Sequence, residues 1–216
     1  MTIELQKRIL SSLILITLSF FFIIKGSFLF NFFLFVGLCI TIYEWHLMSK
    51  KKNYHLIGII FLCFSFYLTY SLRSYPDDKS LLFFLFVIFI CISTDIGGYV
   101  FGNIFKGPKL TKLSPNKTYT GMIGSYFMAI TFSLLLVKNS GLMIEKTYEI
   151  NLELFFLVIL ISTTSQIGDL IVSFFKRLSN IKDTGKLIPG HGGLLDRIDG
   201  LLFVMPVAYL IFYLNY

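Results

Sequence analysis

The chain has 216 residues, of which 56% are hydrophobic and 14% are charged, and its mean hydropathy is +0.78. Because a soluble globular domain carries about 25% charged residues, this composition excludes a soluble domain, and it also excludes a disordered, a collagen-like or a disulfide-framework protein. The net charge of +7 is explained by basic loops that face anionic lipid, without any nucleic-acid partner. The sequence therefore predicts an integral membrane protein.

A transmembrane helix needs roughly 17 to 25 mostly apolar residues, and the chain contains seven apolar runs of about that length. These runs cover residues 9–24, 27–43, 56–72, 81–101, 121–137, 152–172 and 200–216. The first run follows two basic residues, as a signal peptide does, but it has no small-residue cleavage site and another run follows directly, so we expect a retained helix. We therefore expect an all-α, polytopic membrane protein with about seven transmembrane helices.

The placement of Lys and Arg predicts how these helices are oriented. With seven spans, the N-terminus and the loops near residues 44–55, 102–120 and 173–199 share one face of the membrane. These segments hold 14 of the 19 Lys and Arg residues. Because basic residues collect on the cytoplasmic side, we expect the N-terminus in the cytoplasm and the C-terminus outside.

The stretch of residues 165–200 is the most charged part of the chain. Asp169 interrupts an apolar run, and a carboxylate within a spanning segment costs about 2.5–3.5 kcal/mol on insertion scales, so it usually faces a cavity and has a partner. Residues 189–193 read Pro-Gly-His-Gly-Gly, which permits tight turns and close approach of backbone to a ligand. Taken singly, the other charges are ordinary helix ends or surface ion pairs, but jointly these features indicate a functional site.

The carboxylates of this stretch predict a metal ion. Asp196 and Asp199 are three residues apart and share a face of a helix, and Asp169 can approach them across a contact between helices. Three carboxylates repel one another unless a hard cation lies between them, and oxygen-only ligands suit Mg²⁺. We therefore expect Mg²⁺ on all three aspartates, with room for a second cation. The Lys and Arg residues around them suit a polyphosphate ligand.

A second polar stretch, residues 93–124, also follows an apolar run. Asp95 lies near the end of that run, and several glycines follow it. Ser114, Asn116 and Thr118 precede the next helix and offer capping groups, which together with Lys117 would form an anion-binding helix end. Ordinary helix capping and a snorkelling lysine explain this stretch equally well. No Walker A, GxGxxG, HExxH or GxSxG motif occurs, which excludes the familiar soluble nucleotide-binding folds.

At these residues the chain resembles the phosphatidate cytidylyltransferases, also called CDP-diacylglycerol synthases. The family's pattern is Ser-x-x-Lys-Arg, four residues, Lys-Asp, then Pro-Gly-His-Gly-Gly and Asp-Arg-x-Asp, and residues 173–199 match every fixed position. A second family feature, Ser-Pro-x-Lys-Thr with an upstream Asp-x-Gly-x-Tyr-like segment, resembles residues 114–118 and 95–99. Where the family often continues with Trp-Glu-Gly, this chain has Tyr-Thr-Gly at 119–121.

The resemblance implies that CTP and phosphatidate react to give CDP-diacylglycerol and pyrophosphate, in phospholipid biosynthesis. The lipid phosphate would attack the α-phosphorus of CTP in line, with Mg²⁺ assistance. The catalytic set that the resemblance implies is Asp169, Lys176, Arg177, Lys182, Asp183, His191, Asp196, Arg197 and Asp199. The substrate-binding set is Asp95, Ser114, Asn116, Lys117, Thr118, Ser173, Gly190, Gly192 and Gly193.

The roles within these sets are expected to differ. The basic members of the catalytic set would clamp phosphates, and Asp183 would orient a lysine or bind metal. His191 would protonate a leaving oxygen, bind phosphate or orient a carboxylate. The residues at 114–118 would hold the triphosphate or the lipid phosphate.

Two other functions compete with this interpretation. A CTP-dependent lipid kinase would use the same nucleotide but would release CDP in place of pyrophosphate. A small transporter would bury Asp95 and Asp169 along an ion path, but both lie towards the expected cytoplasmic ends of their runs. A CDP-alcohol phosphotransferase would carry an Asp-Gly-x-x-Ala-Arg motif, which is absent.

The chain divides by expected role into N-terminal transmembrane helices at 1–80 and a catalytic transmembrane region at 81–216, with cytoplasmic loops at 102–120 and 173–199. We expect a bacterial inner membrane location, with the site facing the cytoplasm. Small residues such as Gly121, Gly124 and Ser125 on one helix face favour close helix packing, within the chain or in a homodimer.

Overall fold

The computed structural model describes residues 14, 16–111, 114, 117–139, 152–188 and 192–215. Within these ranges the protein is helical, and β-structure is limited to two isolated bridges. A short apolar helix, Ile16–Lys25, comes first. The labelled helices are α2 (Ser27–Ser49), α3 (His55–Arg73), α4 (Asp78–Phe105), α5 (Tyr119–Asn139), α6 (Leu152–Leu178) and α7 (Leu195–Asn215). The predicted all-α class is confirmed.

Helices α2 to α7 are each long and apolar enough to cross a membrane, and each coincides with one of the last six predicted apolar runs, the last of them as far as residue 215. Of the first predicted run, 9–24, the helix that begins at Ile16 is described, and the residues before it lie largely outside the described ranges. Several helices extend beyond the predicted runs. Helix α2 continues from residue 43 to Ser49, and α6 continues from residue 172 to Leu178. Hydropathy marks the membrane-embedded part of a helix, whereas the helical backbone continues into the polar residues beyond it.

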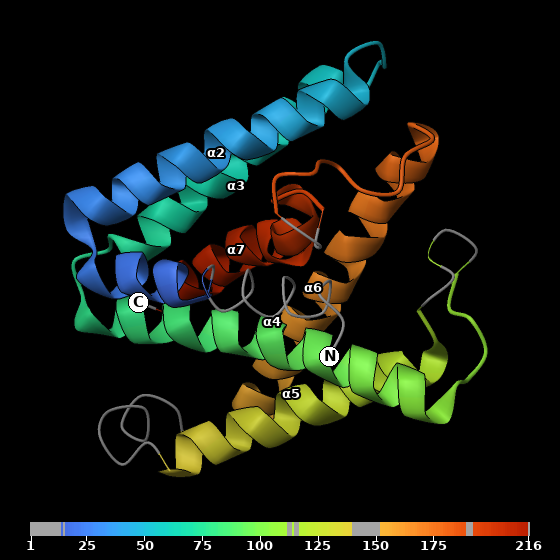
Figure 1. The fold of residues 1–216 in the computed structure, drawn as a ribbon. Helices are drawn as coiled ribbons and strands as arrows, with labels where there is room; N and C mark the ends of the chain where they lie inside the picture. Colours follow the sequence, from blue (N-terminus) through green and yellow to red (C-terminus); the bar gives the residue numbers. More distant parts are fainter. Residues whose placement is uncertain are drawn as a thin grey trace.

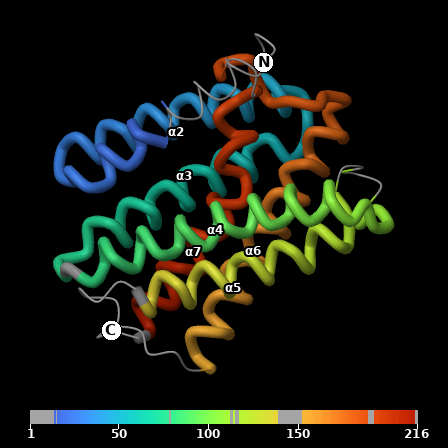
Figure 2. Tube along the Cα trace, turned by 60° about the horizontal axis from the view of Figure 1, so that its bottom comes forward, coloured from blue at the N-terminus to red at the C-terminus, as the bar shows by residue number. Residues whose placement is uncertain are grey.

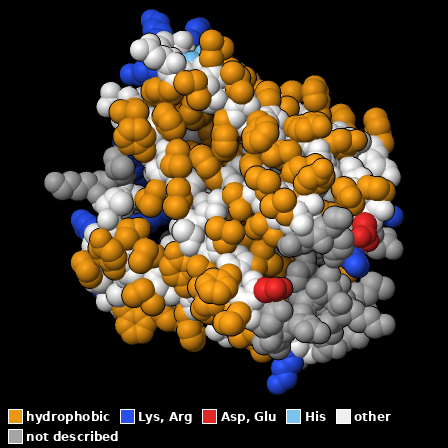
Figure 3. All heavy atoms as spheres, turned by 180° about the vertical axis from the view of Figure 1, so that it is seen from behind, with side chains coloured by type: hydrophobic (Ala, Val, Ile, Leu, Met, Phe, Trp, Pro, Cys, Tyr) orange, Lys and Arg blue, Asp and Glu red, His pale blue; other side chains and the backbone are white. Residues whose placement is uncertain are grey.

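The helices form antiparallel pairs (Figures 1 and 2). Helices α2 and α3 lie side by side as one pair, and α4 and α5 lie side by side as another. Helix α7 packs against α6 and α3 and joins the two pairs. The core between them contains the buried side chains of Val87 and Ile90 from α4, Ile161 from α6 and Met205 from α7. Hydrophobic side chains also cover most of the outer face in Figure 3, with Lys and Arg around its edges, as a lipid-facing surface requires.

The loops that follow α2, α4 and α6 lie at the same end of this bundle, which we call the loop end. Two contacts establish this arrangement. The Tyr54 hydroxyl, in the α2–α3 turn, lies 2.9 Å from the Ser179 hydroxyl, just after α6. Lys117, just before α5, forms an ion pair with Asp169 on α6. The distribution of Lys and Arg predicts that these three loops share one face of the membrane, and their positions agree.

Small residues allow α4 and α5 to pack closely. A Cβ atom on Gly97 would lie 2.5 Å from the Gly124 carbonyl oxygen, and one on Gly98 would lie 2.8 Å from the Ser125 hydroxyl oxygen. Both distances are too short for a real Cβ contact. Two members of the small-residue set that the sequence singled out, Gly124 and Ser125, thus pack α5 against α4 within the chain. Close packing of α4 and α5 fixes the position of the loop between them, from which Lys117 reaches Asp169 on α6.

Candidate active site

Asp169 and Asp199 lie next to each other between α6 and α7. Asp169 lies on α6 and Asp199 lies near the start of α7, and their side chains are close enough to contact each other and to interact through charge. Each aspartate has a glycine beside it. A Cβ on Gly168 would lie 2.7 Å from the Phe203 ring, and one on Gly200 would lie 2.6 Å from a side-chain oxygen of α6. The glycines therefore bring the two carboxylates together.

Three further charged residues surround this pair. Lys117 forms the ion pair with Asp169, whose side chain is 35% exposed. Asp95 on α4 interacts through its charge with Asp169, Lys117 and Arg197. We call Asp95, Lys117, Asp169, Arg197 and Asp199 the aspartate cluster. Four segments that are distant in the sequence therefore contribute to a single group of three carboxylates and two cations.

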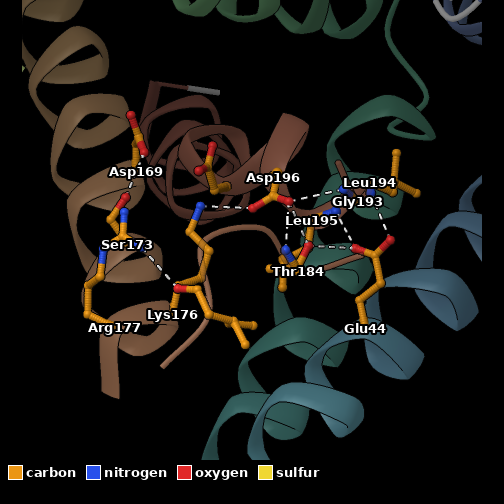
Figure 4. A network of polar contacts seen from close by, with 12 residues as sticks. Glu44, Asp169, Ser173, Lys176, Arg177, Thr184, Gly193, Leu194, Leu195 and Asp196 are labelled. Atoms are coloured by element: carbon orange, nitrogen blue, oxygen red, sulfur yellow. Dashed lines mark hydrogen bonds and ion pairs between the residues drawn. The ribbon is translucent and has the colours of Figure 1, made fainter. Parts of the chain in front are cut away.

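Asp196, in the first turn of α7, is held in a second network (Figure 4). Its Oδ1 accepts a hydrogen bond from the Lys176 ammonium at 2.8 Å. Its Oδ2 accepts from the Thr184 N–H at 2.8 Å, from the Thr184 hydroxyl at 3.0 Å and from the Gly193 N–H at 3.0 Å. The carboxylate is 5% exposed. Both of its oxygens are thus engaged within the protein, and Oδ2, with three donors, more fully than Oδ1.

Glu44 is a site residue that the sequence analysis missed. It lies on α2, and the residue is only 3% exposed. Its Oε1 accepts from the Leu194 N–H at 2.9 Å, and its Oε2 accepts from the Leu195 N–H at 2.8 Å and from the Thr184 hydroxyl at 3.0 Å. Figure 4 shows Thr184 between the carboxylates of Glu44 and Asp196. Glu44 directly follows the predicted apolar run 27–43, so a carboxylate next to the end of an apolar run is the signal that could have found it.

The remaining members of the predicted catalytic set lie at the end of α6 and in the loop between α6 and α7. Arg177 is exposed in the last turn of α6, and its guanidinium donates to the Ile181 carbonyl at 3.0 Å. Lys182 and Asp183 are exposed in the loop itself. Ser173, a turn after Asp169, donates a weak hydrogen bond to it at 3.4 Å. His191, together with Gly190 and Asn116 of the substrate-binding set, lies outside the described residues.

A left-handed backbone conformation explains one glycine of the Pro-Gly-His-Gly-Gly segment. Gly192 has a φ of 92°, a conformation that other residues rarely adopt. The Ile188 N–H donates to the Gly192 carbonyl at 2.9 Å. The prediction of tight turns at residues 189–191 lies outside the described residues.

The second polar stretch opens α5 as predicted, through Thr118. Its hydroxyl oxygen accepts a hydrogen bond from the Gly121 N–H at 3.1 Å, which is an N-cap interaction. Before this cap, the Ser114 carbonyl accepts a hydrogen bond from the Lys117 N–H at 3.0 Å. This hydrogen bond and the cap together place Lys117 where its side chain reaches Asp169.

The donor atoms of the aspartate cluster suit a hard cation. Among the described residues, no group of three His, Cys, Asp or Glu side chains is arranged to hold a metal by itself. Mg²⁺ is commonly held by one or two carboxylates together with substrate phosphates, and the contacting carboxyls of Asp169 and Asp199 provide such a pair. These residues fit Mg²⁺ as a cation that completes its coordination with substrate.

The comparison with known proteins identifies the family. Residues 53–215 match the model of the cytidylyltransferase family. The chain belongs to this family. The resemblance that residues 173–199 and 114–118 suggested is therefore confirmed, and this cytidylyltransferase contains Asp95, Lys117 and the α6–α7 network within the matched range. Glu44 lies before that range.

Individual relatives of this cytidylyltransferase carry a more specific name. The phosphatidate cytidylyltransferase of Rickettsia typhi is 34% identical over 207 residues, which cover 94% of this chain and 89% of the relative. That of Rickettsia bellii is 36% identical over 173 residues, covering 78% of this chain and 73% of the relative. That of Staphylococcus saprophyticus is 36% identical over 154 residues, covering 70% of this chain and 55% of the relative.

Proposed function

We propose that this cytidylyltransferase transfers the cytidylyl group of CTP to phosphatidate, which forms CDP-diacylglycerol and releases pyrophosphate in phospholipid biosynthesis. The observation that carries the proposal is the aspartate cluster at the loop end of an apolar helix bundle. This position lets a phosphorylated lipid in the membrane and a water-soluble nucleotide meet at the same charged group. The names of the relatives support this choice of substrates.

The loop end would face the cytoplasm of a bacterial cell. The predicted segments at this end hold most of the Lys and Arg residues of the chain, as the cytoplasmic side of a membrane protein does. CTP is a cytoplasmic metabolite, so a site at this end has direct access to it. The bacterial sources of the relatives support a location in the cell membrane.

The nucleophile in this reaction is an oxygen of the lipid phosphate. A phosphate monoester carries a charge of about −1.5 to −2 at pH 7, so it needs no general base. The obstacle is instead repulsion between two anions, which positioning and charge neutralisation overcome. Lys117 and Arg197 would neutralise phosphate charge at the aspartate cluster. Lys182 and Arg177, which are exposed at the loop end, would hold the outer phosphates of CTP.

We further propose that Asp169 and Asp199 hold Mg²⁺, with Asp95 beside them. When bound, the ion would neutralise phosphate charge and stabilise the leaving pyrophosphate. Lys117 would then bind substrate phosphate, while Asp169 serves the cation. From the sequence, Lys176 was expected to clamp phosphates. We propose that it instead keeps Asp196 and the α6–α7 loop in place.

The test is to supply purified protein in detergent with CTP, Mg²⁺ and phosphatidate, and to omit each in turn. We expect pyrophosphate and CDP-diacylglycerol in equal amounts, and only when all three are present. Release of CDP in place of pyrophosphate would identify a lipid kinase. Absence of turnover in folded protein that binds CTP would contradict the proposed function.

A further inference from the structure

The contacts of Glu44 are unusual for a buried carboxylate. All three of its partners are neutral: the backbone N–H groups of Leu194 and Leu195 and the hydroxyl of Thr184. Burying a charge is costly unless hydrogen bonds compensate for the lost water. Here the compensation comes from the first N–H groups of α7, where the helix dipole also favours a negative charge. The carboxylate of α2 therefore holds the start of α7.

The α6–α7 loop is shaped to admit this carboxylate. A Cβ on Gly193 would lie 2.5 Å from Glu44 Oε2 and 2.3 Å from the Thr184 hydroxyl oxygen. A Cβ on Gly185 would lie 2.9 Å from Glu44 Oε1. None of these three distances can be accommodated without a shift of neighbouring atoms. The last glycine of the Pro-Gly-His-Gly-Gly segment therefore leaves space for a carboxylate that comes from another helix.

Thr184 connects this anchor to the rest of the site. Its hydroxyl lies 3.0 Å from Glu44 Oε2 and 3.0 Å from Asp196 Oδ2. Because a hydroxyl has one proton to donate, the two carboxylates share it, and the Thr184 N–H bonds to Asp196 in addition. Asp196 in turn pairs with Lys176 of α6. The network therefore joins α2, the loop, α7 and α6.

Asp199, which contacts Asp169, lies only three residues after Asp196. One turn of helix separates the anchored start of α7 from the carboxylate that we propose for Mg²⁺. A shift of a fraction of an ångström at residues 194 and 195 would therefore move Asp199 relative to Asp169. Reactions that depend on positioning are sensitive to such shifts.

We propose that Glu44 is a positioning residue, which acts through the start of α7 and through Thr184 to hold Asp199 in register with Asp169. This inference rests on the proposed function. It assigns a role in the reaction to a residue of the predicted N-terminal region, 1–80. Glu44 touches neither substrate nor metal in this proposal.

The test begins with Glu44→Gln, which keeps the shape of the side chain and removes its charge. We expect kcat to fall about 10- to 100-fold, while KM for CTP changes by no more than about threefold, because alignment is lost but the binding groups remain. Thr41→Val is the matched control. Thr41 is buried one turn earlier on α2 and bonds only to carbonyls of its own helix, so its replacement should leave kcat unchanged.

A second measurement is independent of activity. Amide hydrogen exchange should become faster over residues 182–197 in Glu44→Gln, and it should stay unchanged over α4 and α5. If wild-type protein has no turnover, the proposed function fails, but this exchange measurement still tests the anchor. Unchanged exchange over residues 182–197 would overturn the inference.

Thr184→Val covers the case in which Glu44→Gln does not fold. It removes the shared hydroxyl but keeps the backbone N–H on Asp196, and we expect kcat to fall about threefold or more with KM for CTP unchanged. In a double-mutant cycle, the two substitutions together should cost less than the product of their separate effects. An unchanged kcat in folded Glu44→Gln, or in Thr184→Val where only that variant folds, would overturn the positioning role.

Discussion

Lys117, just before α5, forms an ion pair with Asp169, which interrupts the apolar sequence of α6. The two residues are far apart in the sequence and belong to different motifs, so the pair links the two polar stretches of the chain. Because the same aspartate also contacts Asp199, Asp169 is the common point of the candidate site.

Removing the charge of either contacting aspartate should abolish turnover. We expect Asp169→Asn and Asp199→Asn each to lower kcat by about 10²-fold or more, since contacts to metal or to the transition state usually contribute that much. Both variants should still insert and remain folded, because Asn preserves the shape of the side chain. Steady-state kinetics and size-exclusion chromatography in detergent test this. Asp77→Asn is the control, because Asp77 caps the start of α4, at the end opposite the site.

Asp196 should behave differently from Asp199 towards Mg²⁺. Asp196→Asn breaks a buried pair with Lys176, which typically costs 3–5 kcal/mol of stability, so its melting temperature should fall. Its half-maximal Mg²⁺ concentration should stay close to that of wild type, whereas Asp199→Asn should require about tenfold more Mg²⁺. Activity titrated with Mg²⁺ after chelator treatment separates the two. An equal rise in the half-maximal Mg²⁺ concentration for Asp196→Asn would show that Asp196 is a metal ligand, as predicted from the sequence.

Lys117 should contribute to binding of the phosphorylated substrates. Lys117→Met removes the cation but retains most of the apolar side chain, and we expect kcat/KM for CTP or phosphatidate to fall at least tenfold. The comparison is Lys109→Met, an exposed lysine of the same loop that we place outside the site. Equal kinetics for the two variants would show that Lys117 serves only as a partner for Asp169.

Gly193→Ala should disrupt the loop more than its size suggests. The added methyl group would meet both Thr184 and Glu44, and such overpacking typically costs about 1–3 kcal/mol. We expect a lower melting temperature and a loss of most activity. Gly37→Ala on α2 should be nearly neutral, because its Cβ would lie 3.4 Å from a Phe66 ring atom. Thermal unfolding followed by intrinsic fluorescence, together with the activity assay, tests both.

Much of the fold follows from local patterns. Apolar runs predicted the six helices that are long enough to span a membrane, and the distribution of basic residues predicted which loops share an end. The contact between Asp169 and Asp199 could also be predicted from the sequence. Both residues lie near the facing ends of consecutive apolar runs, so consecutive antiparallel helices bring them to the same level.

The partners of Asp196 and Glu44 could not be predicted in this way. Spacing alone places Asp196 and Asp199 on one helix face. Nothing in the local sequence shows that Asp196 bonds to Lys176 and Thr184, whereas Asp199 contacts Asp169. Glu44 bonds to residues about 150 positions away, and such a contact depends on how α2 packs in three dimensions. The end of the hydropathy run at residue 43 also assigned Glu44 to a loop, although helix α2 continues through it.

The link between Glu44 and the start of α7 has a consequence for how the enzyme is made. A ribosome completes α2 long before it completes α7, so the carboxylate is present while its backbone partners have not yet been synthesised. In a chain synthesised from its N-terminus, the α6–α7 loop therefore acquires its anchored shape only after the start of α7 has been made.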